Sequence, residues 1–126
     1  HFMSVSFAVS TILQLTVALG LLNVWLVRAK APTAYRGGSA QSLKDEFAAY
    51  GLPEWTFYTV GGLKIGAAIL LIVGIWIPGL IRPSALVVAA LMVGALAMHA
   101  KAKDSSTKFV PALLVLVMAV AIIVLN

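Results

Sequence analysis

Residues 4–27 read SVSFAVSTILQLTVALGLLNVWLV and contain no charged side chain. A helix rises about 1.5 Å per residue, so this stretch exceeds the roughly 30 Å of a bilayer's hydrocarbon core. It lacks the basic start and the A-x-A-like site of a cleavable signal peptide. We therefore predict that it is a permanent membrane-spanning helix.

Three further apolar stretches follow at residues 55–77, 84–100 and 109–125, and only the first of these contains a charged residue, Lys64. Backbone groups in lipid must bond within their own segment or close a barrel, and four apolar runs of this length can only be helices. The chain is 62% hydrophobic and 10% charged, whereas a soluble domain is about 25% charged. We predict one all-α integral membrane domain over residues 1–126, a four-helix bundle in contact with the lipid bilayer.

The one long polar connection, residues 28–54, contains the pattern of a short helix. Ser42 stands three residues before Asp45, which is the spacing of a capping box. Apolar residues then recur at helical spacing, namely Leu43, Phe47 and Tyr50. The sequence predicts a short interfacial helix that covers one end of the bundle, and a solvated linker is the alternative.

The basic residues predict the orientation. Only Arg82 lies in the second connection, and the other loop cations lie in the first and third. These are Arg28, Lys30, Arg36, Lys44, Lys101, Lys103 and Lys108. The positive-inside rule then places the first and third connections in the cytoplasm and both termini outside. Because this bias explains the net charge of +5, no nucleic-acid partner is expected.

Polar residues near the cytoplasmic end are the candidate ligand-binding residues. Lys64 is costly inside a spanning helix, and its ammonium is expected to lean back over Val60 and Phe57. There it either contacts a ligand or reaches the headgroups or a loop carboxylate such as Glu54. Asn23 and His99 fall at the same end, so a pocket shared with Lys64 is possible. Alternatively, Asn23 bonds across helices and His99 caps the end of its own helix.

Two other features also leave alternatives open. Gln14 can bond across helices, as Asn23 can, and the G-x-x-x-G of Gly62 and Gly66 predicts internal helix packing or a homodimer contact. Aromatic residues at helix ends either anchor the bundle in the interface or stack on a ligand. These are Trp25, Trp55 and Tyr58 at the cytoplasmic end and Trp76 at the other. The predicted ligand-binding set is Lys64, Asn23, His99, Phe57, Tyr58 and Trp55.

Several kinds of site are excluded by composition. The chain has no cysteine, and His99 is its only histidine besides the leading His1. A thiolate metal site, a disulfide framework and a bis-histidine haem therefore cannot form. We expect no metal site and no built-in cofactor.

Four segments resemble the DoxX-like family of small bacterial membrane proteins. They are VALGLLNVWLVRAK at 17–30, YRGGSAQSLKDEFAAYGLPEW at 35–55, VGGLKIGAAILLIVGIWIP at 60–78 and LMVGALAMHAKAKD at 91–104. The most specific marks are AYGLP at 49–53 and the Gly94-Ala95 pair before His99. Many members carry glutamate at the position of Lys64, so this sequence departs from them there. The resemblance implies four transmembrane helices in a bacterial cytoplasmic (inner) membrane.

The resemblance also implies a function. Members similar to thiosulfate:quinone oxidoreductase subunits point to quinone-linked redox chemistry. We expect a protein that binds a lipophilic or anionic small molecule, such as a quinone, near the cytoplasmic leaflet and is accessory to membrane redox chemistry. The alternatives are a catalytic subunit of a quinone-linked oxidoreductase, with its redox centre on a partner subunit, and a small dimeric transporter.

Overall fold

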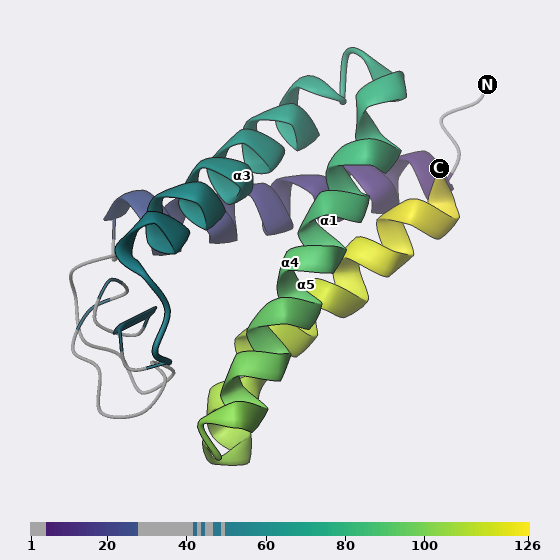
Figure 1. Ribbon diagram of the computed structural model, residues 1–126. Helices are drawn as coiled ribbons and strands as arrows, with labels where there is room; N and C mark the ends of the chain where they lie inside the picture. The colour runs from purple at the N-terminus through teal and green to yellow at the C-terminus, as the bar shows by residue number, and fades with distance from the viewer. Residues whose placement is uncertain (1–4, 28–41, 43, 45–46, 49) are drawn as a thin grey trace.

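The computed structural model describes residues 5–27, 42, 44, 47–48 and 50–126. This part of the chain contains four long helices and no strand (Figure 1). They are α1 (Val5–Leu22), α3 (Glu54–Val73), α4 (Ile81–Lys101) and α5 (Ser106–Leu125). A π-helical turn, η1 (Asn23–Val27), continues α1, and a 3₁₀ turn, η2 (Pro78–Leu80), precedes α4. All four helices are long and apolar enough to cross a membrane, which confirms the predicted all-α membrane bundle.

The two helix ends on either side of the second connection differ from the expected spans. α3 ends at Val73 instead of Ile77, and the next residue, Gly74, lies against Ile81. A Cβ atom on Gly74 would lie 2.8 Å from Cγ1 of Ile81, so the close approach requires glycine. α4 begins at Ile81 instead of Ser84, because a proline in the first turn loses no backbone hydrogen bond. That proline is Pro83.

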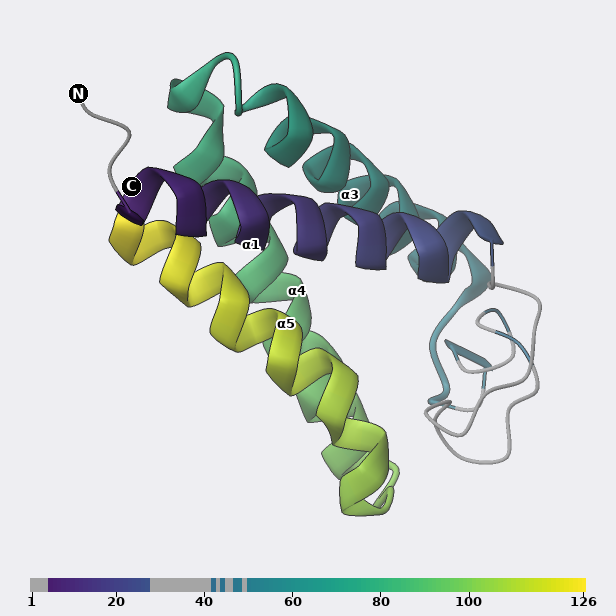
Figure 2. The same cartoon turned by 180° about the vertical axis from the view of Figure 1, so that it is seen from behind.

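The four helices form two pairs, α1 with α3 and α4 with α5 (Figures 1 and 2). The pairs meet at one end, here called the terminal end, where α1 begins, α3 passes into α4 and α5 ends. They diverge toward the other end, here called the basic end, where the turn between α4 and α5 lies (Figure 1). This turn and its flanks contain Lys101, Lys103 and Lys108.

The core between the pairs consists mainly of small and branched apolar residues. Val17 and Ala18 of α1 pack in one cluster with Ala68 and Leu71 of α3, and all four are fully buried. α4 and α5 add Ala85, Val88, Met92, Ala112, Ala119 and Ile122 to this cluster. Many large apolar side chains remain exposed on the outer faces, as expected of a protein whose solvent there is lipid.

Two packing expectations are corrected. Cβ atoms on Gly62 and Gly66 would meet nothing within 4 Å, so internal packing does not use the G-x-x-x-G pair. The glycine in close contact is Gly61, where a Cβ would lie 2.6 Å from the indole of Trp25. Trp25 is accordingly 7% exposed, and it makes a buried contact between η1 and α3 instead of being an exposed anchor.

The expected short helix between Ser42 and Tyr50 falls mostly outside the described residues, which exclude Leu43, Asp45, Glu46 and Ala49. Within it, Lys44, Phe47 and Ala48 are helical.

Candidate functional site

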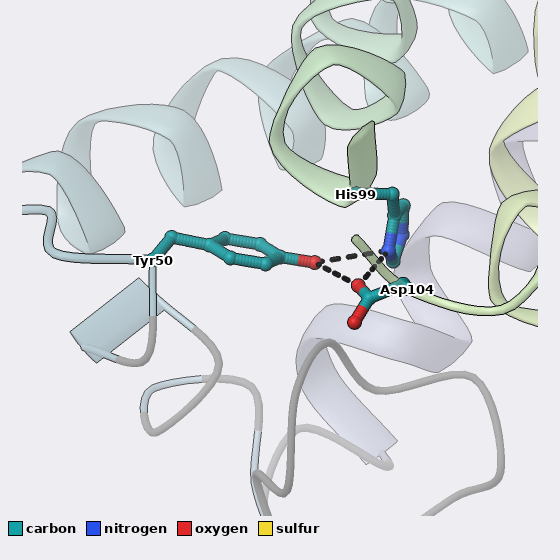
Figure 3. Close-up of polar contacts among 3 residues, drawn as sticks. All are labelled: Tyr50, His99 and Asp104. Carbon is teal, nitrogen blue, oxygen red and sulfur yellow. Dashed lines mark hydrogen bonds and ion pairs between the residues drawn. The ribbon is translucent and has the colours of Figure 1, made fainter. Parts of the chain in front are cut away.

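A buried polar group lies at the basic end, formed by Tyr50, His99 and Asp104 (Figure 3). Nδ1 of His99 lies 2.7 Å from Oδ2 of Asp104 and 3.0 Å from the hydroxyl oxygen of Tyr50. The Tyr50 hydroxyl also donates to the same carboxylate oxygen at 3.4 Å. The side chains of His99 and Asp104 are only 7% and 3% exposed. A histidine and a carboxylate are thus held together almost without solvent.

The end of α4 explains why Asp104 reaches His99. The N–H of Asp104 donates to the carbonyl of His99 at 3.0 Å, and the N–H of Lys103 donates to that of Ala100 at 3.1 Å. These are the two bonds of a Schellman motif, in which the chain reverses after the last helical turn. Lys103 occupies the left-handed position with a φ of 55°, where glycine is usual. The reversal brings the Asp104 side chain back to the imidazole.

Tyr50 joins this turn to the segment before α3. Its backbone is followed by Gly51, whose φ of 76° is left-handed, and the chain turns there toward Pro53 and α3. Tyr50 is 8% exposed, and its ring contacts the imidazole of His99 edge-on, with centroids 5.9 Å apart. The ammonium of Lys101 donates to the Tyr50 carbonyl at 3.4 Å. The two helix pairs are therefore linked at the end where they diverge.

The hydrogen bonds assign the proton of the His99 ring. An ionised carboxylate only accepts, so Nδ1 carries the proton that it donates to Asp104. The ring also lies 5.4 Å from that of Phe109, centroid to centroid, which fixes the orientation from a second side. The described hydrogen bonds of this imidazole use Nδ1, and with the proton on Nδ1 the other ring nitrogen, Nε2, is an acceptor.

A second group at this end is aromatic. Trp25 contacts Phe57 with centroids 5.3 Å apart and Phe47 edge-on at 5.9 Å. Tyr58 contacts Phe57 at 5.1 Å. The ammonium of Lys64 lies over the Trp25 ring, 5.3 Å from its centroid, which is within cation–π range. Lys64 therefore leans toward the start of α3, as the sequence predicted, and it packs on η1.

An exposed ion pair lies at the start of α3. Nζ of Lys44 lies 2.9 Å from Oε1 of Glu54, and the hydrogen bond to Glu54 raises the pKa of Lys44 above its ordinary value. The Lys44 ammonium also lies 5.7 Å from the centroid of the Tyr58 ring. Both charged side chains are more than half exposed, so this pair contributes little to stability. Glu54 is thus engaged by Lys44.

The predicted ligand-binding residues fall into separate places. Phe57 and Tyr58 belong to the aromatic group with Lys64, and His99 belongs to the Tyr50 and Asp104 group. Asn23 and Trp55 are exposed. The contacts of His99 described above lead to Tyr50, Asp104 and Phe109, none of which was in the predicted set.

Sequence reasoning missed Tyr50 and Asp104. Tyr50 was assigned to the apolar face of the short helix, so its hydroxyl was not considered. Asp104 follows His99 by five residues across a helix end, and this spacing is a usable signal for a side chain that returns to the last turn. No group of three metal-ligating His, Cys, Asp or Glu side chains exists among the described residues.

A third polar group lies at the terminal end. The Gln14 side chain donates to the carbonyl of Leu71 at 3.0 Å, which confirms that Gln14 bonds across helices. Leu71 is near the end of α3. The N–H of Ile75, which would bond to the Leu71 carbonyl in a continuing helix, donates to the Ile72 carbonyl, so Gln14 supplies a donor for the Leu71 carbonyl. Ser10 donates to the Gln14 carbonyl oxygen at 2.9 Å. Asn126 donates to Ser10 at 2.7 Å and so ties the end of α5 to α1.

The sequence was compared with known proteins. No curated protein and no solved structure matches it. Residues 12–122 match the DoxX-like family, and this match includes all of α3 and α4 and most of α1 and α5. The chain therefore belongs to the DoxX-like family.

Proposed function

We propose that this membrane protein binds a lipophilic molecule with a carbonyl-bearing head, of the quinone class, at the basic end. The observation that supports this is the buried His99 imidazole, oriented through Nδ1 by Asp104 and Tyr50. In the Nδ1–H tautomer Nε2 accepts a hydrogen bond from the hydroxyl of the reduced, quinol form of the head, and with a second ring proton it donates to the carbonyl of the quinone form. The protein is accessory to membrane redox chemistry, with electrons supplied by a redox partner subunit.

The low exposure of the group suits this task. A charged or polar contact is stronger where water is excluded, and Asp104 fixes the imidazole before any ligand arrives. A rigid imidazole loses little conformational freedom on binding, and it selects for the position of the ligand's polar head.

Lys64, with Phe57, Tyr58, Trp55 and Asn23 at the same end, is the proposed second site, for an anionic head. The ammonium on the Trp25 ring provides the charge, and exposed Trp55 and Tyr58 provide aromatic surface toward the interface. We further propose that the basic end faces the cytoplasm of a bacterium and that both termini lie outside, following the distribution of the basic residues.

The test for the His99 site uses His99→Asn. The Asn amide nitrogen takes the position of Nδ1 and can still donate to Asp104, whereas nothing replaces Nε2. The purified protein is extracted with organic solvent and its bound quinone measured by mass spectrometry. Loss of a hydrogen bond to a buried polar head should reduce retained quinone about tenfold.

The control is Ala100→Asn, which adds the same side chain to an exposed position in the last turn of α4. We expect it to retain quinone at the wild-type level. Equal retention by His99→Asn and wild type would reject the role of His99. An extract of the wild-type protein without quinone, even after incubation with a short-chain quinone, would reject the function itself.

A further inference from the structure

A cavity lies at the terminal end, far from the His99 group. Its volume is about 170 Å³, and it lies between the first half of α1, the connection from α3 to α4 and the end of α5. Ser10, Thr11, Gln14 and Asn126 supply polar atoms to its wall, while Phe7, Pro78 and Ile81 supply apolar ones. A water molecule occupies roughly 30 Å³ of liquid, and an apolar cavity of about 150 Å³ is known to take a benzene ring. The space is thus large enough for a six-membered ring.

Gln14 is the polar residue that makes this cavity specific. It is 2% exposed, and its amide group has two N–H donors. One donates to the Leu71 carbonyl, and the carboxamide oxygen accepts from Ser10, so the orientation of the amide is fixed. Among the described residues the second N–H has no acceptor. A buried donor without an acceptor is unfavourable in proteins.

We propose that this cavity binds a carbonyl group carried on a small apolar body, with the carbonyl oxygen accepting the second N–H of Gln14. The mixed wall fits such a molecule, because Phe7, Pro78 and Ile81 can pack on the apolar body while Gln14 holds the oxygen. In a membrane this chemistry comes from two sources, the ring of a quinone or the ester of a lipid. The site is independent of His99, because it lies at the opposite end of the bundle.

The chain offers a direct probe of this contact, since Gln14 and Gln41 are its only glutamines. Protein labelled with ¹⁵N in the glutamine side chains gives two pairs of amide proton signals by NMR, one pair for each NH2 group, and Gln14→Met assigns them by removing one pair. The protein is placed in nanodiscs of ether-linked phosphatidylcholine, which has no ester carbonyl. It is then compared with ester-linked nanodiscs and with ether-linked nanodiscs containing a short-chain benzoquinone.

We expect one Gln14 amide proton to shift downfield in at least one of the two carbonyl-containing samples, while Gln41 stays unchanged. The sample that shows the shift identifies the source. If the Gln14 signals are the same in all three samples, the cavity contains water at most and the proposal is wrong.

Two threonine variants show whether binding in the cavity causes the shift of the Gln14 signal. Thr11 lines the cavity, so the larger side chain of Thr11→Leu should fill part of it while Gln14 is left unchanged. Thr16→Leu is the matched control, because Thr11 and Thr16 both donate to the carbonyl four residues earlier and Thr16 is outside the cavity wall. The shift should be lost in Thr11→Leu and kept in Thr16→Leu. A shift that survives Thr11→Leu would place the ligand elsewhere and overturn the proposal.

Discussion

His99 and Asp104 are hydrogen-bonded to each other twice, once through their side chains and once through the backbone. Nδ1 lies 2.7 Å from Oδ2, and the Asp104 N–H donates to the His99 carbonyl at 3.0 Å. The backbone bond belongs to the motif that ends α4, whereas the side-chain bond orients the imidazole. The same turn therefore ends the helix and builds the candidate site.

Removing the carboxylate should destabilise the protein. Asp104→Ala leaves Nδ1 of a buried histidine without its acceptor, so we expect the free energy of unfolding to fall by about 1–3 kcal/mol. Asp104→Asn should lose less, because its amide oxygen still accepts from Nδ1. Unfolding of the purified protein in detergent, followed by tryptophan fluorescence, measures both.

The matched control is Glu54→Gln, which changes an exposed acid paired with Lys44. Exposed ion pairs contribute little, so no measurable change is expected. If Asp104→Ala is as stable as wild type, the Tyr50, His99 and Asp104 contacts contribute nothing to folding.

Lys103 offers a stabilising change. Its φ of 55° is left-handed, a conformation that is unfavourable for a residue with a Cβ by roughly 1–2 kcal/mol. Lys103→Gly removes this strain, but glycine also raises the conformational entropy of the unfolded chain. We therefore expect a net gain of about 0.5–1 kcal/mol in the free energy of unfolding.

Ala100→Gly, in the last turn of α4, should instead lower stability by about 0.5–1 kcal/mol, because the position is helical. Unfolding curves of the two variants in detergent, compared with that of the wild type, distinguish the two effects. Lower stability of Lys103→Gly would mean that the lysine side chain contributes more than its backbone strain takes away.

The four spans could be predicted from the sequence because uninterrupted apolar length alone requires a membrane helix. The ends of the helices could not, since the apolar run continues from Val73 to Ile77 and gives no sign of where α3 stops. His99 was found from its residue type and position. Its partners were not, because Tyr50 reaches it only after the segment before α3 has crossed to the turn between α4 and α5.

Gly61 and Gly62 are neighbours with opposite predicted responses to the same substitution. A Cβ on Gly61 would lie 2.6 Å from Trp25, so Gly61→Ala should displace the indole and destabilise the protein by about 1–3 kcal/mol. Gly62→Ala adds a methyl group in open space and should stabilise α3 by about 0.5–1 kcal/mol. Fluorescence of Trp25, the buried tryptophan, should shift only in Gly61→Ala. Equal effects of the two variants would contradict the close contact between Trp25 and α3.

The proposed orientation is testable at the turn between α4 and α5. The chain has no cysteine, so Ser105→Cys introduces the only thiol. Ser105 is exposed, and with this turn in the cytoplasm it should react with an impermeant maleimide only after the cells are opened. A cysteine at Gly79, exposed in the second connection, is the control and should react in intact cells. The reverse pattern would place both termini in the cytoplasm.

Lys64 decides whether the basic end contains one ligand site or two. Lys64→Met keeps an unbranched apolar stem and removes the ammonium that lies over Trp25. A lost charged contact is worth about 1.5–3 kcal/mol, so retention of an anionic amphiphile, measured by mass spectrometry after extraction, should fall about tenfold or more. Lys64→Arg should retain it, since the charge stays. Folding should be kept, because a charge inside a spanning helix is itself unfavourable.

Quinone retention should stay at the wild-type level, because Lys64 and His99 belong to different groups of contacts. If Lys64→Met loses quinone as strongly as His99→Asn, both residues serve a single ligand, and the division of the basic end into two sites is wrong.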